Sequence, residues 1–527
     1  MKKQVYTALF LACGIPAMAQ LPEDAFRMGY TVPGGTARSQ AIGGAVGALG
    51  GDLSNLFNNP AGLAFYKSSE IVLSPQFGFY NGKGDFRGTN TSGEGFNKFN
   101  MGASGFVTGW TDRYSRWGTK AFGIAINRTA NFNGVVNYKG LNDYSSYSTN
   151  MAYEFYNYYA DQRDANPGKS DADIIEDALD DNALSLLTKM GLYTYLIDVD
   201  SGPGGQGTVF SRAEEADILN QSYVAKTTGG ITEISLGMGA NMDDKLYFGG
   251  SLGIPIVNYN RVSTYRESDV DGKGNNEFDF SQYKEEFSSK GVGFNVKLGL
   301  IYKPVEALRV GLAVHTPSFY GLRDKFSSNM TTNIDTATGN IKEFNVNSSV
   351  FFNNTDPSYK YNLNTPWRFI ASGAYVFGGG VEDVSKQQGF ISADVEYVTY
   401  GASRLRSADE YEEDDYYKDV NNVIKGEYKG ALNFRVGGEL KFNTFMTRLG
   451  FAHYGNPYKD GALDASRTNL SAGLGFRDRG MFLDLTYVHS IYKDVNFPYR
   501  VDAPLANTFA ETTQTNGQVV LTVGFKL

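Results

Sequence analysis

The chain has 527 residues, with 48 Lys and Arg against 57 Asp and Glu and a formal net charge of −9. This length is too great for a simple two-sheet sandwich, and the acidic balance leaves no basic stripe for nucleic-acid binding. No stretch after the leader reaches the roughly 18–20 apolar residues of a membrane helix. A membrane barrel is still allowed, because half of each barrel strand faces a polar lumen.

Residues 1–19 are typical of a cleaved signal peptide. Lys2-Lys3 supplies the charged region, an apolar stretch follows, and Ala17-Met18-Ala19 fits the small-residue cleavage pattern, which would leave Gln20 first. The only cysteine, Cys13, lies in this leader, and its acylation as a lipoprotein is the alternative reading. Cleavage after the leader leaves no cysteine, which excludes disulfides and thiol catalysis in the mature chain.

Residues 20–68 form a compact, Gly-rich segment before the first strand. Gly43-Gly44 is one of several glycine pairs here, and Asn59-Pro60-Ala61 lies in a turn sequence. Pro60 fixes one backbone dihedral and lacks an N–H, which suits a tight bend.

Fourteen segments after residue 70 alternate apolar and polar residues, as strands do when successive side chains point to opposite faces. In 290–302, for example, Val292, Phe294 and Val296 share one face with the other apolar residues. The expected strands are 70–80, 98–110, 119–138, 227–241, 245–263, 287–303, 308–323, 360–377, 389–404, 427–442, 445–454, 468–477, 481–491 and 516–527. Pro75 predicts a bulge or gap in the first strand, because it cannot donate a ladder hydrogen bond.

The connections between these segments alternate short and long. The short ones centre on 111–116, 242–244, 304–307, 378–388, 443–444 and 478–480, and the longest of the others is 139–226. This pattern predicts an all-β fold for residues 69–527, a transmembrane antiparallel β-barrel of about 14 strands with both termini in the periplasm. Fourteen strands enclose a lumen that needs filling, and we expect residues 20–68 to be the hatch that plugs it.

The long connection 139–226 carries helix signals. Ser170 followed by Asp173 opens a capping pattern. Apolar residues at helical spacing follow, and they include Ile174, Leu179, Leu184, Leu187, Met190 and Leu192. This stripe either packs the loop onto the barrel rim or forms a hydrophobic groove that captures a ligand.

The tenth strand places Asn433, Arg435, Glu439 and Lys441 on one face. Charges that face a lumen usually pair with the plug, and the alternative is that Arg435 or Lys441 holds a ligand carboxylate. Asp484 and Thr486 of the thirteenth strand are expected to belong to the lumen wall.

Other motifs do not indicate catalysis or metal binding. The stretch 269–274 is only half a calcium loop, so we expect a surface turn, and the acidic run 409–419 with its tyrosines is interpreted as a solvated loop tip. His315, His453 and His489 stand singly, with no nucleophile motif nearby. We therefore expect no enzyme activity, no cofactor and no metal site.

Three stretches resemble the FadL-type family of outer-membrane transporters for long-chain fatty acids and other hydrophobic compounds. Gly34-Gly35-Thr36-Ala37-Arg38-Ser39-Gln40-Ala41-Ile42-Gly43-Gly44-Ala45 and the later Asn59-Pro60-Ala61-Gly62-Leu63 resemble the family's N-terminal hatch. Residues 291–311 are similar to a mid-barrel hairpin, and Leu363-Asn364-Thr365-Pro366-Trp367-Arg368-Phe369 is similar to the start of the eighth strand. The longest loop follows the third strand here, whereas the family's helical loop usually follows the fifth.

The resemblance implies passive, energy-independent uptake. An outer groove would capture the ligand, an internal site would hold it, and a hatch movement beside a kink in the third strand would release it sideways. Gly43, Gly44, Asn59, Pro60 and Ala61 would be the hatch and gating residues.

We therefore expect a monomeric protein of a Gram-negative type of outer membrane, exported by its signal peptide. Its expected partners are a hydrophobic small molecule, outer-membrane lipid and lipopolysaccharide. A barrel scaffold or shuttle for protein secretion and a small-solute porin are the alternatives.

Overall fold

The computed structural model describes residues 22–32, 34–112, 114–201, 207–270, 277–335, 341–378, 388–408, 415–501, 505 and 507–527. The expected leader 1–19 lies outside the described residues, as do most of the turn 269–274 and the first part of the run 409–419. In the described part of the chain, no helix is long and apolar enough to cross a membrane.

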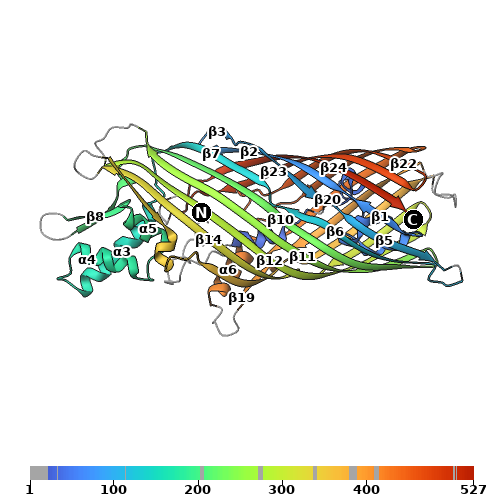
Figure 1. Ribbon diagram of the computed structural model, residues 1–527, viewed down its shortest axis with the longest axis horizontal. Helices are drawn as coiled ribbons and strands as arrows, with labels where there is room; N and C mark the ends of the chain where they lie inside the picture. The colour runs from blue at the N-terminus through green and yellow to red at the C-terminus, as the bar shows by residue number, and fades with distance from the viewer. Residues whose placement is uncertain are drawn as a thin grey trace.

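One antiparallel sheet closes into a barrel of fourteen strands, which confirms the predicted fold class (Figure 1). β24 pairs with β1 and β2 and so joins the last strand to the first. In order, the wall strands are β1 (Glu70–Leu73) with β2 (Pro75–Phe86); β3 (Thr89–Ser92), β4 (Phe96–Met101) and β5 (Ser104–Thr111); β6 (Thr119–Asn131) with β7 (Gly134–Asn142); β10 (Leu219–Met242); β11 (Leu246–Asp269); β12 (Phe278–Val305); β13 (Leu308–His315) with β14 (Phe319–Asp335); β15 (Ile341–Asn347), β16 (Ser358–Asn364) and β17 (Arg368–Phe377); β18 (Gly389–Thr399) with β19 (Arg404–Ser407); β20 (Gly430–Phe442); β21 (Phe445–Tyr454); β22 (Arg467–Asp478); β23 (Met481–Asn496); and β24 (Ala510–Lys526).

Five short connections, at 111–116, 242–244, 304–307, 443–444 and 478–480, lie at the predicted places, and most of the sixth, 378–388, lies outside the described residues. The short connections define what we call the inner end of the barrel, and the long connections define the outer end. Several strands continue further outward than expected: β12 begins at Phe278, nine residues before the predicted start at 287. The apolar alternation used for the prediction ends where the outer surface becomes polar. The break expected at Pro75 is confirmed, because β1 ends at Leu73 and β2 begins at Pro75.

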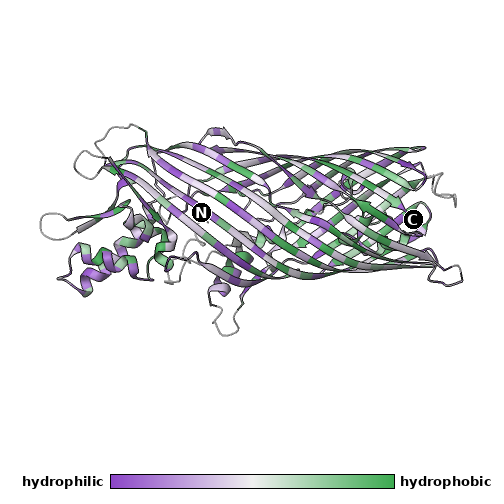
Figure 2. Ribbon diagram, in the orientation of Figure 1, coloured by the Kyte–Doolittle hydropathy of each residue, from purple (hydrophilic) through white to green (hydrophobic). Residues whose placement is uncertain are grey.

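The outer surface of the barrel divides into two zones. Hydrophobic residues gather on the wall toward the C-terminal end in Figure 2, while the opposite end is mostly hydrophilic. Outward side chains in the apolar zone are well exposed, for example Val292 at 52%, Phe294 at 54% and Leu298 at 61%. A monomeric soluble protein rarely exposes so wide an apolar surface, and a band of this kind faces lipid in a membrane barrel.

The N-terminal segment packs inside the barrel. Its elements are α1 (Pro22–Gly29), α2 (Ala37–Ala41), and the 3-10 helices η1 (Leu53–Phe57) and η2 (Pro60–Phe65). Nearly every described side chain of α2, η1 and η2 is buried, and hydrogen bonds join α2 to β22, β23 and β24.

The loop after the third strand projects beyond the outer end of the barrel (Figure 1). It contains α3 (Thr149–Ala165), α4 (Asp171–Asp180), α5 (Leu186–Tyr193), the hairpin of β8 (Ile197–Ser201) and β9 (Gly207–Ser211), and η3 (Arg212–Glu215). The predicted cap is confirmed, since Ser170 Oγ accepts a hydrogen bond from the Asp173 N–H at 3.2 Å.

The interpretation of 409–419 as a solvated loop tip is wrong for its described part. Residues from Asp415 form the start of helix α6 (Asp415–Glu427), and Tyr417 is buried. Tyr417, Val420 and Ile424 lie on one face of α6 and pack into the outer core, because their spacing brings them together on a helix. The helix also ends at Glu427, so the tenth strand begins later than the predicted 427.

Two smaller elements complete the outer end, η4 (Ser348–Phe352) and η6 (Tyr400–Ala402). Together with α1, α6 and the loop helices they contribute to one large apolar core at the outer end of the barrel.

Candidate functional site

Glycines in the barrel wall make room for the N-terminal segment. A Cβ at Gly249 would lie 2.2 Å from the Pro60 carbonyl oxygen, and a Cβ at Gly299 would lie 1.9 Å from Oδ1 of Asn59. Only glycine allows backbones to approach so closely. The inner faces of β11 and β12 are therefore shaped to receive η2.

The turn Asn59-Pro60-Ala61 anchors this segment to the wall. The buried Asn59 side chain accepts a hydrogen bond from the Ala61 N–H at 3.2 Å and caps η2. Its amide nitrogen donates to the Gly47 carbonyl at 2.6 Å and lies 3.3 and 3.4 Å from the carbonyls of Leu300 and Leu312. Pro60 takes the first helical position, where a missing N–H leaves no bond unmade.

Gly43 and Gly44 turn the chain after α2. Their φ angles of +67° and +78° lie in the left-handed region, which favours glycine. A Cβ on Gly43 would also lie 2.7 Å from the carbonyl oxygen of Phe451 in β21. Both glycines thus fit the segment against the wall, and their gating role stays a prediction.

Arg435 of β20 is buried and held by two carboxylates. Its guanidinium lies 3.3 Å from Glu396 and 3.6 Å from Asp394. Asp394 in turn accepts a hydrogen bond from the Gly47 N–H of the N-terminal segment at about 3.2 Å. A ligand carboxylate at Arg435 would have to compete with both acids. Lys441 is half-buried near the inner end of β20, roughly 20 Å along the strand from Arg435.

A second charged cluster lies closer to the inner end. Arg448 is fully buried and donates to Glu439 and Asp484 at 2.6 Å each. Arg38 of α2 approaches the same Glu439 at 3.5 Å. Asp484 therefore faces the lumen as expected, and the cluster ties α2 to β20, β21 and β23.

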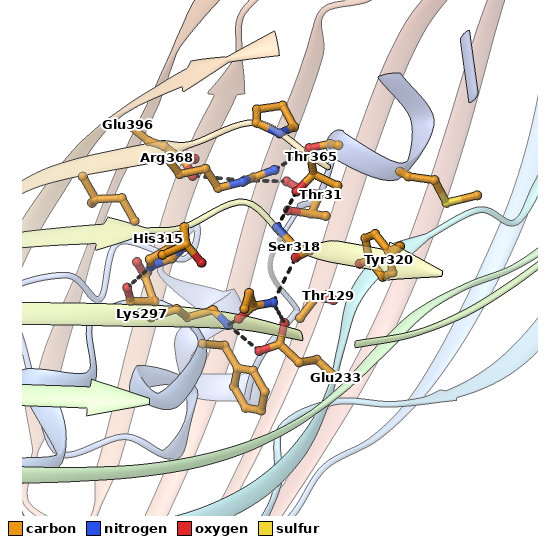
Figure 3. Close-up of a pocket in the computed structure, with 18 residues that line it drawn as sticks. Thr31, Thr129, Glu233, Lys297, His315, Ser318, Tyr320, Thr365, Arg368 and Glu396 are labelled. Atoms are coloured by element: carbon orange, nitrogen blue, oxygen red, sulfur yellow. Dashed lines mark hydrogen bonds and ion pairs between the residues drawn. The ribbon is translucent and has the colours of Figure 1, made fainter. Parts of the chain in front are cut away.

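A cavity of about 60 Å³ lies between the N-terminal segment and the wall (Figure 3). Strand residues supply most of its polar lining, and Met28, Phe57 and Asn58 of the N-terminal segment complete one side. His315 shares a hydrogen bond of 2.6 Å with the Asn58 carbonyl, so the wall also holds the segment here. We call this the first cavity.

The charges of the first cavity are balanced. Lys297 forms an ion pair with Glu233 and also donates to Asn295 at 2.6 Å. Arg368 pairs with Glu396 at 3.1 Å. The cavity therefore offers hydrogen-bonding groups, and none of its cations lacks a partner in the described part of the chain.

A second cavity, also of about 60 Å³, has a different lining. Polar uncharged side chains surround it, and its charged lining residues are Arg128 and Arg467, with no Asp or Glu. Arg467 lies 3.7 Å above the Tyr492 ring and donates to Asn469 at 3.1 Å, while Arg128 donates to Thr232 at 3.2 Å. Among described residues neither arginine pairs with a carboxylate, so the described lining carries two positive charges and no negative one.

Three described residues of the N-terminal segment, Thr31, Val32 and Gly34, border the two cavities. Thr31 lines the first cavity, whereas Val32 and Gly34 line the second. The Gly34 N–H donates to the Arg128 carbonyl at 3.1 Å, and a Cβ on Gly34 would lie 2.5 Å from that oxygen. This stretch is thus fitted closely against the third strand.

The third strand is interrupted beside the second cavity. β6 ends at Asn131 and β7 begins at Gly134, and the β5–β6 ladder stops at the pair Ser104 and Ile126. Within residues 75–112 and 119–142, the ladder partner of β4 is β2 and not the third strand. No ladder therefore joins β4 to β7, which pairs with β10 on its other side. Asn131 donates to the Tyr80 hydroxyl at 2.6 Å, and both line the second cavity.

The six apolar residues predicted in the outer loop come together in the outer core. Ile174 and Met190 are fully buried, Leu184 and Leu192 are buried, and Leu179 and Leu187 pack at the edge of the same core. Met190 Sδ lies 3.5 Å from Ser328 Oγ of β14, which docks α5 on the barrel. Burial on this helix also lowers the pKa of Lys189.

No family model and no curated protein sequence matches this chain. Among solved structures it is similar to a FadL homologue of Pseudomonas aeruginosa, with 12% sequence identity, a TM-score of 0.52, and coverage of 94% of this chain and 99% of that protein. The chain has the FadL fold. A second match is the toluene transporter TodX of P. putida, with 11% identity, a TM-score of 0.47, and coverage of 95% of this chain and 99% of that protein. A third is the toluene transporter TbuX of Ralstonia pickettii, with 12% identity, a TM-score of 0.47, and coverage of 95% of this chain and 100% of that protein.

Sequence reasoning missed the polar residues that line both cavities of this FadL-fold barrel. Lys297 was on the expected lumen face of its strand, and a search for charged residues on lumen faces could have found it with Glu233 and Arg368. Arg128 carried no such signal. In the ladder between β6 and β10, Arg128 stands opposite Thr232 and Ala130 stands opposite Ile231, so Thr129 has no partner in this ladder. This bulge ends the simple alternation of faces.

Proposed function

We propose that this protein admits hydrophobic small molecules across the outer membrane by passive diffusion between binding sites. The observation that carries the proposal is the position of the second cavity directly beside the interruption of the third strand. A ligand there would be close to a place where no strand ladder closes the wall. The route would begin in the apolar outer core and pass through both cavities.

The ligand we propose is a long-chain, fatty-acid-like compound. An aliphatic tail suits the apolar outer core, and the two arginines of the second cavity suit an acidic head group, because guanidinium and carboxylate form strong charge-assisted hydrogen bonds. Arg467 and Arg128 thus replace Arg435 and Lys441 as the residues we favour for the head group.

Capture and release would use the segments that cover the two ends of this route. We propose that the loop core around Ile174, Leu179, Leu184, Leu187, Met190 and Leu192 parts to receive the aliphatic tail. The N-terminal segment, held by Asn59-Pro60-Ala61 and turned at Gly43-Gly44, would act as the hatch. Its stretch between Thr31 and Gly34 would have to shift before a ligand moves from the first cavity to the second.

The test is import of labelled oleate into cells that carry wild-type protein, no protein, Arg467→Gln or Arg116→Gln. Arg116 is an exposed arginine at the inner end, paired with Asp243, and serves as the matched control. Losing a charge-assisted hydrogen bond worth about 1.5–3 kcal/mol should weaken oleate binding by Arg467→Gln roughly 10- to 100-fold. Import should fall in this variant and in cells without the protein, and stay normal in the control.

Normal import without the protein would contradict the proposal. Stable recovery of a secreted protein with the barrel would favour a secretion scaffold instead, and large ion conductance in planar bilayers would favour a porin.

A further inference from the structure

Three exposed basic residues stand directly opposite one another on the outside of the barrel. The strand register pairs Lys290 of β12 with Arg323 of β14, and Arg323 with Lys360 of β16. Residues opposite each other in an antiparallel pair have Cβ atoms about 5 Å apart. Three positive charges therefore lie side by side across roughly 10 Å of the wall.

Two more exposed cations extend this row. Lys325 lies two residues further out on β14, and Arg406 of β19 stands opposite Asn362, two residues inward from Lys360. In the described part of the chain, none of these five cations forms an ion pair with a carboxylate.

Among the described residues, two exposed acids lie near the row in sequence, Glu286 and Asp356, while Asp409 and Glu410 after Arg406 lie outside the described residues. Glu286 pairs with Lys284 at 2.7 Å, on the part of β12 that lies further out. Asp356 precedes the start of β16 at Ser358 and so lies further out than Lys360. The described residues of the patch therefore carry an excess of positive charge.

This arrangement is unfavourable for an isolated barrel. Like charges directly opposite on neighbouring strands destabilise a sheet, whereas opposite charges stabilise it. The row contains two such like-charged contacts, Lys290 with Arg323 and Arg323 with Lys360. An anion bound across the row would remove this repulsion.

The height of the row on the barrel identifies the anion. Val292 and Phe294 follow Lys290 toward the inner end and belong to the apolar band. The exposed Phe319 stands opposite Phe294, and the exposed Trp367 lies just before β17 begins. Aromatic residues mark the boundary between lipid and water in membrane barrels. The row lies one outward-facing position, about 7 Å, above Val292 on the outer side. This is the level at which the head groups of membrane lipids meet water.

We propose that Lys290, Arg323 and Lys360, with Lys325 and Arg406 beside them, bind the phosphate groups of lipopolysaccharide in the outer leaflet. Arginine contacts a phosphate through two parallel hydrogen bonds, and lysine contributes a point charge. This site faces away from the lumen and does not depend on the transport role. It holds the barrel in its lipid and neutralises the row.

The experiment measures lipid A binding to full-length protein in nanodiscs by native mass spectrometry. We compare wild type, the triple variant Lys290→Gln/Arg323→Gln/Lys360→Gln, and the control Lys139→Gln/Lys342→Gln/Lys493→Gln. The control removes three exposed cations that lie on the outer parts of β7, β15 and β23 and are not in register with one another. Each cation near a lipid phosphate contributes about a fivefold change in affinity, so the triple variant should bind about 100-fold more weakly. The control should stay within a few-fold of wild type.

Thermal unfolding shows whether a loss of lipid A binding by the triple variant comes from misfolding of that variant. Without lipid A, the triple variant should be at least as stable as wild type, because the repulsion is gone; with lipid A, only wild type and the control should gain stability. Dephosphorylated lipid A and inorganic phosphate should each fail to stabilise wild type. Equal binding by the triple variant, equal binding of dephosphorylated lipid A, or stabilisation by inorganic phosphate alone would overturn the proposal.

Discussion

Asn59 offers a direct test of how the N-terminal segment is held. We expect Asn59→Ala to loosen η2, because it removes the bond to Gly47, the cap on Ala61 and the approaches to Leu300 and Leu312. A buried polar group left unsatisfied costs about 1–3 kcal/mol, and loss of an N-cap typically costs about 1 kcal/mol. The local opening free energy of the segment should therefore fall by roughly 2–4 kcal/mol.

Asn59→Asp separates the two roles of this side chain. Aspartate caps a helix as well as asparagine does, so a capping role alone predicts little change. The structure instead predicts a loss at least as large as in Asn59→Ala, because the second carboxylate oxygen would face carbonyl oxygens that now accept from the amide. Hydrogen exchange of the backbone amides of Gly47 and Ala61 measures the effect, with Asn362→Ala as the exposed control. Unchanged protection in Asn59→Asp would refute the reasoning.

Three further variants test other parts of the structure. Arg448→Met leaves Asp484 without its buried ion-pair partner and leaves Glu439 with Arg38 alone. Urea unfolding should therefore show a loss of about 3–5 kcal/mol, and a loss below about 1 kcal/mol would contradict this account. Gly34→Val places a side chain against the Arg128 carbonyl, so it should displace the stretch between the cavities and raise conductance in planar bilayers. The control Gly373→Ala, whose added Cβ meets no atom within 4 Å, should leave conductance unchanged. Equal conductance of the two variants would argue against a gate here. Met190→Asp should undock α5 and reduce oleate import, whereas Met190→Leu conserves volume and should import normally, and normal import by both would exclude the loop core from capture.

The strands were predictable because the membrane imposes a simple rule on their outer face. Val292, Phe294 and Leu298 face lipid, so every second residue had to be apolar. Beyond the membrane this rule ends, and the outer parts of β10, β11 and β12 were missed. α6 was missed for a related reason: Tyr417, Val420 and Ile424 have helical spacing, but acidic neighbours hide it.

The anchoring of the N-terminal segment was partly predictable, because Gly43, Gly44 and Asn59-Pro60-Ala61 are unusual locally. The cavities were not predictable. Arg467 and Tyr492 come from different strands, and only the ladder register brings them together. The pairing of Arg435 with Glu396 and Asp394 likewise depends on which strands are neighbours. The bulge at Thr129, which ends the alternation near the interruption of the third strand, leaves no mark in the apolar pattern.

The most direct test of the proposed route is photo-crosslinking of wild-type protein in mild detergent. A long-chain fatty acid with a diazirine in its tail is irradiated with the protein, and mass spectrometry locates the adducts. Our account predicts adducts on peptides that line the outer core and the two cavities, including those around Tyr80 and Asn131, and it predicts that unlabelled oleate removes them. Adducts confined to the outer apolar band and unaffected by oleate would contradict it.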